Sequence, residues 1–131
     1  MISIEQLRAI SKARLQDAIV LLENDRVDGA AYICGYAVEL ALKARICITL
    51  NWDGFPQTRS EFENYSSFKT HKLDVLLMLS GWEKRIKAEQ IQQWSRVAPW
   101  EPEARYKAVG HFERNNVEVM LASVKVLLEV L

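Results

Sequence analysis

The segment from Val27 to Leu50 limits the folds open to this chain more than any other part of the sequence. It is apolar around most of its circumference, and small side chains recur along it at helical spacing. A helix of this kind must be covered on most sides, so it belongs in the middle of a helical bundle. The small residues form a seam that lets a second helix approach closely: Ala30, Cys34, Ala37, Ala41 and Ala44.

Segments near the two ends of the sequence also predict helices. Ser3 and Gln6 have the spacing of a capping box, and the apolar residues after them recur at helical spacing, which predicts a helix over about 4–23. Asn115 and Glu118 have the same spacing, so we expect Asn115 to be the N-cap of the final helix.

The middle of the sequence is less regular. Thr70 is expected to cap a third helix, and 83–96 predicts a weaker fourth helix. Residues 51–67 and 97–114 show no evident period and are expected to be irregular, and no segment predicts a strand convincingly. The expected class is an all-α, up-down bundle of four to five helices in a single domain over 1–131.

Charge and cysteine content exclude several classes of protein. The 17 basic and 17 acidic residues balance, which argues against a DNA-wrapping basic protein and an acidic disordered tail. Residues 69–96 carry six basic and three acidic side chains, a net charge of +3 that suits a solvated face as well as an RNA-facing one.

No signal peptide or membrane-spanning segment is evident. Cys34 and Cys47 fall ~20 Å apart on one helix, too far for a disulfide, so free buried thiols and a cytoplasmic protein are expected.

Motifs of the common enzyme classes are absent. The sequence has no glycine-rich phosphate loop with its lysine and no nucleophile elbow. A zinc site needs three or four convergent ligands, and this chain offers only His71 and His111 beside two core cysteines. No metal and no cofactor is therefore expected.

One face of the Val27–Leu50 helix is polar. Tyr32, Tyr36, Glu39 and Lys43 are spaced by four, three and four residues, so they share that face. The stripe is either an ordinary Glu–Lys pair at the rim of the core or a buried polar cluster that orients a site. A carboxylate on so apolar a helix needs a cation, and we expect Arg105 or, failing that, Lys43 to bond Glu39.

Three motifs occur in order along the chain: GAAYICGYAVELALKA at 29–44, His71-Lys72-Leu73 followed by Leu76-Leu77, and WEPEARY at 100–106. The first resembles the signature second helix of HEPN domains (higher eukaryote and prokaryote nucleotide-binding), and the second resembles the third helix of that family. The last resembles the W-x-P-E-x-R-Y segment of one prokaryotic branch. The resemblance implies a helical bundle that usually dimerises. It also implies RNA- or nucleotide-linked roles, often beside a minimal nucleotidyltransferase in toxin–antitoxin or defence settings.

Catalytic members of the family resemble metal-independent ribonucleases in which a histidine follows an arginine after four to six residues. Arg105 and His111 have this spacing. A histidine can move the proton of the 2′-hydroxyl or of the leaving group, and an arginine can hold the scissile phosphate. In the alternative interpretation, Arg105 and Tyr106 anchor their loop to the bundle and the spacing is a chance match.

Three functions therefore remain open. The leading one is a HEPN-domain protein, non-catalytic or weakly catalytic, that binds RNA, a nucleotide or a partner protein. The alternatives are a metal-independent endoribonuclease using Arg105 and His111, and a structural dimerisation module. A homodimer is expected because Trp82, Trp94 and Trp100 supply more aromatic surface than a small monomer can cover.

Overall fold

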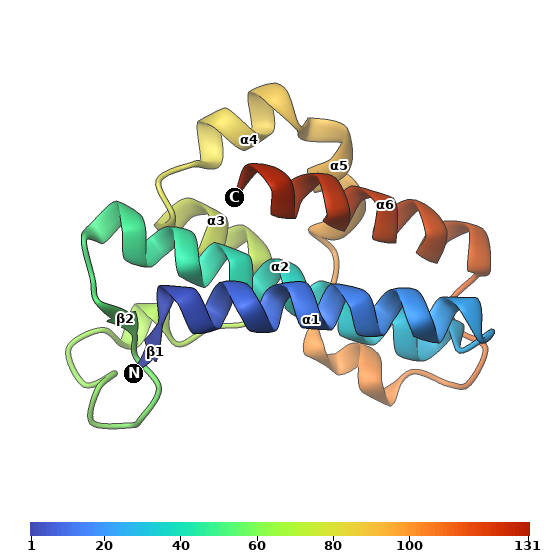
Figure 1. Ribbon diagram of the computed structural model, residues 1–131, viewed down its shortest axis with the longest axis horizontal. Helices are drawn as coiled ribbons and strands as arrows, with labels where there is room; N and C mark the ends of the chain where they lie inside the picture. Colours follow the sequence, from blue (N-terminus) through green and yellow to red (C-terminus); the bar gives the residue numbers. More distant parts are fainter.

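The computed structural model describes residues 1–131, which form a bundle of α-helices (Figure 1). The α-helices are α1 (Ile4–Glu23), α2 (Val27–Leu50), α3 (Leu73–Leu79), α4 (Glu83–Glu89), α5 (Ile91–Val97) and α6 (Arg114–Val130). Two 3₁₀ helices lie between them, η1 (Ser66–Phe68) and η2 (Pro102–Tyr106). The strands β1 (Ile2–Ser3) and β2 (Gly54–Phe55) form one short antiparallel pair, which the sequence did not predict because two residues are too few to show an alternating pattern.

The first two helices have the bounds that the sequence predicts. The capping box at the start of α1 is confirmed: the Ser3 hydroxyl accepts from the Gln6 amide at 3.2 Å, and the Gln6 side chain accepts from the Ser3 amide at 3.2 Å. A tight turn with Asp25 in the left-handed region, at φ +59°, then returns the chain along α1 as α2.

Helix α2 is the centre of the bundle, as its composition predicts. Half of its 24 residues are buried, and it packs against α1, α3 and α6. The small-residue seam brings the helices close enough for the Ser11 hydroxyl on α1 to donate to the Ala37 carbonyl at 2.6 Å. Cys34 and Cys47 are both buried and free, as expected.

Some predicted helix boundaries are wrong. The expected helix over 83–96 is two short helices, because Gln90 leaves helical geometry at φ −132° and ψ 33°. Thr70 does not cap α3: the N-cap is Lys72, and the Thr70 hydroxyl accepts from the Lys72 amide at 3.1 Å, outside the helix. Asn115 lies inside α6, whose N-cap is Glu113, and Glu118 pairs instead with Arg114.

The aromatic argument for a dimer is also wrong, because this chain covers its own tryptophans. Trp94 is 2% exposed and Trp100 is 8% exposed. Trp82 is half-buried between the guanidinium groups of Arg45 and Arg85, which lie 4.0 and 4.3 Å from its ring centre. None of the helices has both the length and the apolar composition that a membrane crossing requires.

Candidate functional site

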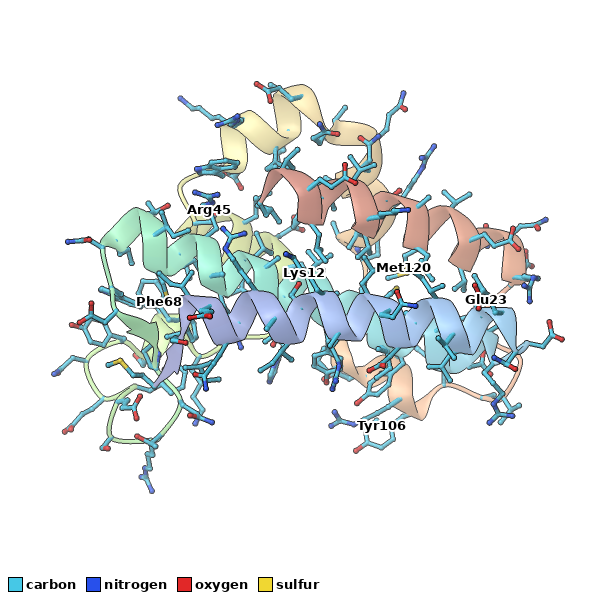
Figure 2. The ribbon with its side chains drawn as sticks, viewed as in Figure 1. Lys12, Glu23, Arg45, Phe68, Tyr106 and Met120 are labelled. Atoms are coloured by element: carbon cyan, nitrogen blue, oxygen red, sulfur yellow. The ribbon has the colours of Figure 1, made fainter.

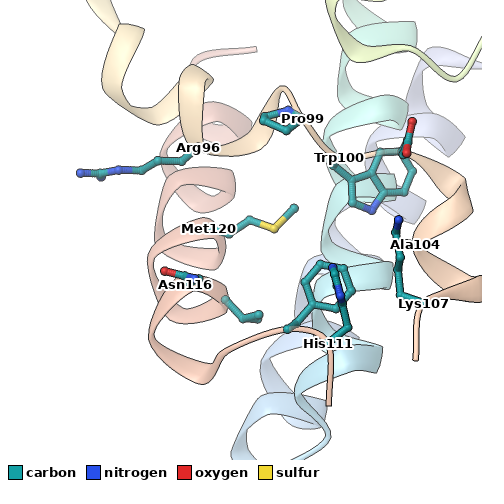
Figure 3. Close-up of a pocket in the computed structure, with 11 residues that line it drawn as sticks. Arg96, Pro99, Trp100, Ala104, Lys107, His111, Asn116 and Met120 are labelled. Atoms are coloured by element: carbon teal, nitrogen blue, oxygen red, sulfur yellow. The ribbon is translucent and has the colours of Figure 1, made fainter. Parts of the chain in front are cut away.

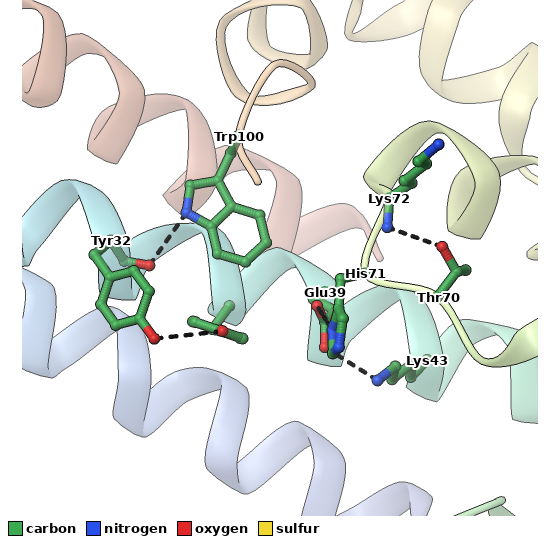
Figure 4. Close-up of polar contacts among 8 residues, drawn as sticks. Tyr32, Glu39, Lys43, Thr70, His71, Lys72 and Trp100 are labelled. Carbon is green, nitrogen blue, oxygen red and sulfur yellow. Dashed lines mark hydrogen bonds and ion pairs between the residues drawn. The ribbon is translucent and has the colours of Figure 1, made fainter. Parts of the chain in front are cut away.

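The polar stripe of α2 lies where two irregular segments cover the helix, residues 70–72 before α3 and residues 98–106 after α5 (Figure 4). Tyr32 and Tyr36 are half-buried under the second segment, and Glu39 meets the first. The helical spacing of the stripe therefore brings its side chains to one surface, as the sequence predicts.

Glu39 is buried at 3% exposure, and both of its carboxylate oxygens have a partner. Oε2 pairs with the Lys43 ammonium at 3.0 Å, and Oε1 lies 2.9 Å from Nδ1 of His71. The first-choice expectation, that Arg105 bonds Glu39, is wrong, and the fallback expectation of Lys43 is confirmed. Lys43 lies one helical turn from Glu39, so its ammonium group reaches the carboxylate within the same helix.

His71 is the residue of this cluster that sequence reasoning missed. Its ring meets Glu39 through Nδ1, yet 61% of its side chain is exposed, so the opposite edge with Nε2 faces solvent. The only sequence signal at this position is the His71-Lys72-Leu73 motif, which carries no information about a contact with α2 across 32 residues.

The tyrosines of the stripe form a second polar group with Arg105. The Tyr32 and Tyr36 hydroxyls lie 3.5 Å apart. Hydrogen bonding by the Tyr36 hydroxyl, and then by Arg105, lowers the pKa of Tyr32, whereas burial raises the pKa of Tyr36 to about 12. Hydrogen bonds to Tyr106 and Tyr32 raise the pKa of Arg105. The Arg105 guanidinium lies 4.9 Å from the Tyr106 ring centre.

Arg105 and Tyr106 are both exposed, and Tyr106 projects from η2 into solvent with 76% of its side chain accessible (Figure 2). Trp100 also anchors the segment to α2. The indole Nε1 donates to the Tyr32 carbonyl at 3.2 Å, and the indole ring meets the edge of Tyr36 at a centroid distance of 4.8 Å.

Two clefts flank Trp100 and share Pro99, Trp100 and Glu101 in their walls. We call the larger, of about 530 Å³, the Arg105 cleft. We call the smaller, of about 290 Å³, the His111 cleft. The charged and polar walls of the Arg105 cleft include His71, Lys72, Asp74, Glu101, Glu103 and Arg105. The His111 cleft is lined by Arg96, Trp100, Lys107, His111, Phe112 and Asn116, among others. The structure thus places Arg105 and His111 in different clefts.

The loop that carries His111 is fixed by Asp28 at the start of α2. One Asp28 carboxylate oxygen accepts from the Gly110 amide at 2.7 Å, and the other accepts from the Phe112 amide at 3.2 Å. These two backbone hydrogen bonds hold the pKa of Asp28 below its usual value. Gly110 has φ +85°, which a glycine adopts at little cost. The sequence did not single out Asp28, because nothing local links it to a loop 82 residues away.

Neither cysteine is suited to act as a nucleophile. Burial raises the pKa of the Cys34 thiol to about 12 and that of Cys47 to about 11, so neither carries a useful thiolate fraction near neutral pH. The structure contains no group of three or more His, Cys, Asp or Glu side chains placed to hold a metal ion.

The comparisons with known proteins agree with the fold. The sequence matches the HEPN domain family over residues 4–131. Neither the curated proteins nor the solved structures give a significant match. Because the family match spans nearly the whole chain, and the chain folds as a helical bundle, this protein belongs to the HEPN domain family.

Proposed function

We propose that this HEPN domain binds single-stranded RNA or a nucleotide in the His111 cleft. Membership of the family supports an RNA- or nucleotide-related function, or dimerisation, in general. One observation supports this cleft as the binding site: two side chains of the loop after η2, Lys107 and His111, line it together with the aromatic rings of Trp100 and Phe112 (Figure 3).

The chemistry of the walls suits a nucleotide. Lys107 and His111 point into the cleft, and Trp100 and Phe112 supply aromatic surface against which a base can pack. Within the cleft the one acidic residue, Glu101, is balanced by Lys107, and Arg96 at the edge brings the net charge of the lining residues to +1. Its volume of about 290 Å³ is at the small end for ligand sites and fits one nucleotide unit better than a large cofactor.

Arg96 extends the basic surface beyond the cleft. Its guanidinium points away from the cavity (Figure 3), so it would contact the next phosphate of a strand and not a single bound nucleotide. This arrangement favours an oligonucleotide over a mononucleotide.

We also propose that Arg105 and His111 do not act as a catalytic pair, although their spacing resembles the family's ribonuclease motif. General acid–base catalysis and phosphate stabilisation must act on one phosphodiester at hydrogen-bonding distance. Arg105 lines one cleft and His111 lines the other, with Trp100 in the wall between them, which supports the proposal that no single phosphodiester meets both side chains.

Two partner proposals rest on the family alone. HEPN domains often dimerise, and we propose that this chain forms a homodimer; light scattering would then give about twice the 15.1 kDa chain mass. A molar mass equal to that of one chain at micromolar concentration would exclude the homodimer. A nucleotidyltransferase partner in a toxin–antitoxin or defence setting is the second proposal, and co-purification with the product of a neighbouring nucleotidyltransferase gene would test it.

RNA binding is tested by fluorescence anisotropy with a labelled, mixed-sequence 12-nucleotide RNA and with labelled AMP. Lys107→Gln is expected to weaken RNA binding roughly tenfold, because one phosphate contact is lost at low salt. Lys84→Gln is the matched control, since Lys84 is exposed on α4 and lines neither cleft. Equal affinities of Lys107→Gln and Lys84→Gln, or no binding by the wild type, would exclude the His111 cleft as the site.

A further inference from the structure

We propose that a cleft beside Trp52 binds an organic cation that carries an alkylated ammonium group. The cleft has a volume of about 390 Å³ and lies where α2 ends and β2 begins, at the end of the bundle where α1 starts (Figure 1). We call it the Trp52 cleft, and its walls include Asn51, Trp52, Asp53, Pro56, Glu61 and Tyr65. It shares no residue with the His111 cleft or the Arg105 cleft, so the inference does not depend on the proposed RNA binding.

Trp52 is the centre of a group of aromatic side chains in residues 52–68. Its ring centroid lies 4.9 Å from that of Phe68, 5.0 Å from that of Tyr65 and 6.4 Å from that of Phe55. Its backbone amide donates to the Cys47 carbonyl at 2.8 Å, at the C-terminal end of α2. Because packing and the backbone both fix the indole, this wall of the cleft is formed before any ligand binds.

Two rings of this aromatic group already hold ammonium groups of the chain itself. The Lys43 ammonium lies 5.2 Å from the centre of the Phe55 ring, and the Lys69 ammonium lies 5.9 Å from the centre of the Phe62 ring. No Lys or Arg of the chain lies over Trp52 or Tyr65, and these are the two rings that line the cleft. Since a cation within about 6 Å of an aromatic ring is attracted to it, and most strongly to indole, the two rings are available to a cation from outside.

The two rings that line the cleft form a corner. Trp52 and Tyr65 meet at an angle of 64°, with their centroids 5.0 Å apart. Tyr65 is 43% exposed, so the corner is open to solvent. A compact, rounded cation such as a trimethylammonium group can contact both rings there, whereas a flat ring would stack on one of them only.

The charge of the cleft also favours a cation. Glu61 is already paired with the Met1 ammonium at 2.8 Å, and it accepts from the Gln57 amide at 3.1 Å. Asp53 is exposed and forms no ion pair in this structure. With Asp53 and Glu61 negative and Met1 positive, the lining residues carry a net charge of −1, and Asp53 is the charge that a ligand would meet.

The mixture of groups distinguishes an alkylated ammonium from other cations. Calcium takes six to eight oxygen ligands, and the cleft offers one unpaired carboxylate. An unmodified lysine ammonium is strongly hydrated and brings three donors that need acceptors. Alkyl groups on the nitrogen replace these donors with apolar surface, which can pack on Trp52, Tyr65 and Pro56 while the charge stays near Asp53.

The strand pair closes the cleft from the side of α1. Gly54 lines the cleft and pairs with Ser3 of β1. A β-carbon at Gly54 would lie 2.7 Å from the Ile2 carbonyl oxygen and 3.0 Å from Sδ of Met1, so only glycine lets β1 approach this closely. The approach brings Met1 to the cleft and places its ammonium on Glu61.

Binding is measured by titrating the full-length, ¹⁵N-labelled protein with choline at constant ionic strength. The indole N–H of Trp52 and the amide of Asp53 are expected to shift and saturate with a Kd in the millimolar range or below, while the indole signals of Trp82 and Trp94 stay unchanged. The matched ligand is the neutral analogue of choline in which carbon replaces nitrogen. It has the same shape without the charge, so it should bind at least about tenfold more weakly.

Two variants test the two parts of the site. Tyr65→Leu removes one ring of the corner and should weaken choline binding roughly 2–30-fold. Asp53→Asn removes the unpaired charge and should weaken it roughly threefold or more. Asp17→Asn is the matched control, because Asp17 is exposed on α1 and lines none of the clefts described. Thermal melts establish that each variant is folded, and Asp53→Asn keeps the test valid if Tyr65→Leu is not.

Several outcomes would overturn the inference. Absence of saturable shifts excludes the site, and equal affinities for choline and its neutral analogue show an apolar pocket without preference for a cation. Choline binding that is unchanged in Asp53→Asn and in folded Tyr65→Leu places the ligand elsewhere. Failure of the wild type to bind RNA contradicts the proposed function and leaves this site untouched.

A peptide containing trimethyllysine identifies the source of the ammonium group. Tighter binding of this peptide than of choline supports the site and assigns the group to a modified protein. Tighter binding of choline supports the site and assigns the group to a free small molecule. The same peptide with unmethylated lysine should bind more weakly than the trimethylated one, and equal or tighter binding would overturn the assignment to an alkylated ammonium.

Discussion

The indole ring of Trp100 rests directly on Gly35 of α2, at a point where any side chain would overlap it. A β-carbon at Gly35 would coincide with the six- and five-membered rings of Trp100. The absence of a side chain at one helical position therefore sets how closely residues 98–106 approach the bundle. Since Trp100 is a wall of both clefts, this contact also positions Lys107 on one side and Arg105 on the other.

Gly35→Ala is expected to destabilise the protein by about 1–3 kcal/mol, because the added methyl group forces Trp100 out of its place. Gly29→Ala is the matched control on the same helix. A β-carbon at Gly29 meets only the Leu21 side chain, at 3.5 Å, so alanine there should be neutral or stabilising by up to ~1 kcal/mol through helix propensity. Urea unfolding of both variants measures the difference, and equal midpoints would contradict the packing argument.

Glu39→Ala is expected to lower the free energy of unfolding by about 3–5 kcal/mol, because Lys43 would be left without its partner at the edge of the core. For a domain of this size, that corresponds to a melting temperature lower by roughly 10–20 °C. Glu83→Ala is the comparison, since its pair with Lys87 is about half exposed on both sides and should contribute less than ~1 kcal/mol. Thermal melts in which the two variants match would contradict a buried pair.

The helices of this chain could be predicted more fully than its side-chain contacts. The bounds of α1 and α2 follow from a capping box and a helical apolar pattern, which act within a few residues. The break at Gln90 could not be predicted, because the sequence keeps helical residues on both sides of it; Ile86 before the break and Trp94 after it are both buried.

At the candidate site, too, the local pattern along the helix could be predicted and the contacts between distant segments could not. Periodicity placed Tyr32, Tyr36, Glu39 and Lys43 on one face, but it could not show that His71 would reach Glu39 from a separate segment. Arg105 was expected at Glu39 because a guanidinium suits a carboxylate. The tight seating of Trp100 on Gly35 instead leaves η2 at the surface, with Arg105 among tyrosines.

Asp28 is expected to make the conformation of the His111 loop depend on acidity. Its pKa is lowered by bonds from the Gly110 and Phe112 amides, so the folded loop favours the carboxylate form. The stabilisation is complete above the usual carboxyl pKa near 3.8 and is lost as the pH falls further, through the lowered value. The amide proton shifts of Gly110 and Phe112 should therefore titrate below about pH 4. In Asp28→Ala they should be independent of pH over this range, and titration that persists there would assign the effect to another group.

Arg45 is expected to stabilise the contact between α2 and Leu131. Its Nε and one terminal nitrogen donate to the Leu131 carbonyl at 3.0 and 2.6 Å, while its guanidinium stacks on Trp82. Burial, and then the nearby charges of Arg8 and Arg85, lower the pKa of Arg45. Lysine keeps the charge but loses the planar fork, so Arg45→Lys should cost about 1–2 kcal/mol of unfolding free energy.

Arg85→Lys provides the control for Arg45, because Arg85 stacks on the same Trp82 ring yet is exposed and makes only a loose pair with Glu89 at 3.6 Å. The substitution Arg85→Lys should change the free energy of unfolding by less than ~0.5 kcal/mol, as is usual for an exposed residue. Guanidinium unfolding of the two variants separates the contributions. If Arg85→Lys destabilises the protein as much as Arg45→Lys does, the stacking on Trp82 accounts for the stability and the bonds to Leu131 do not.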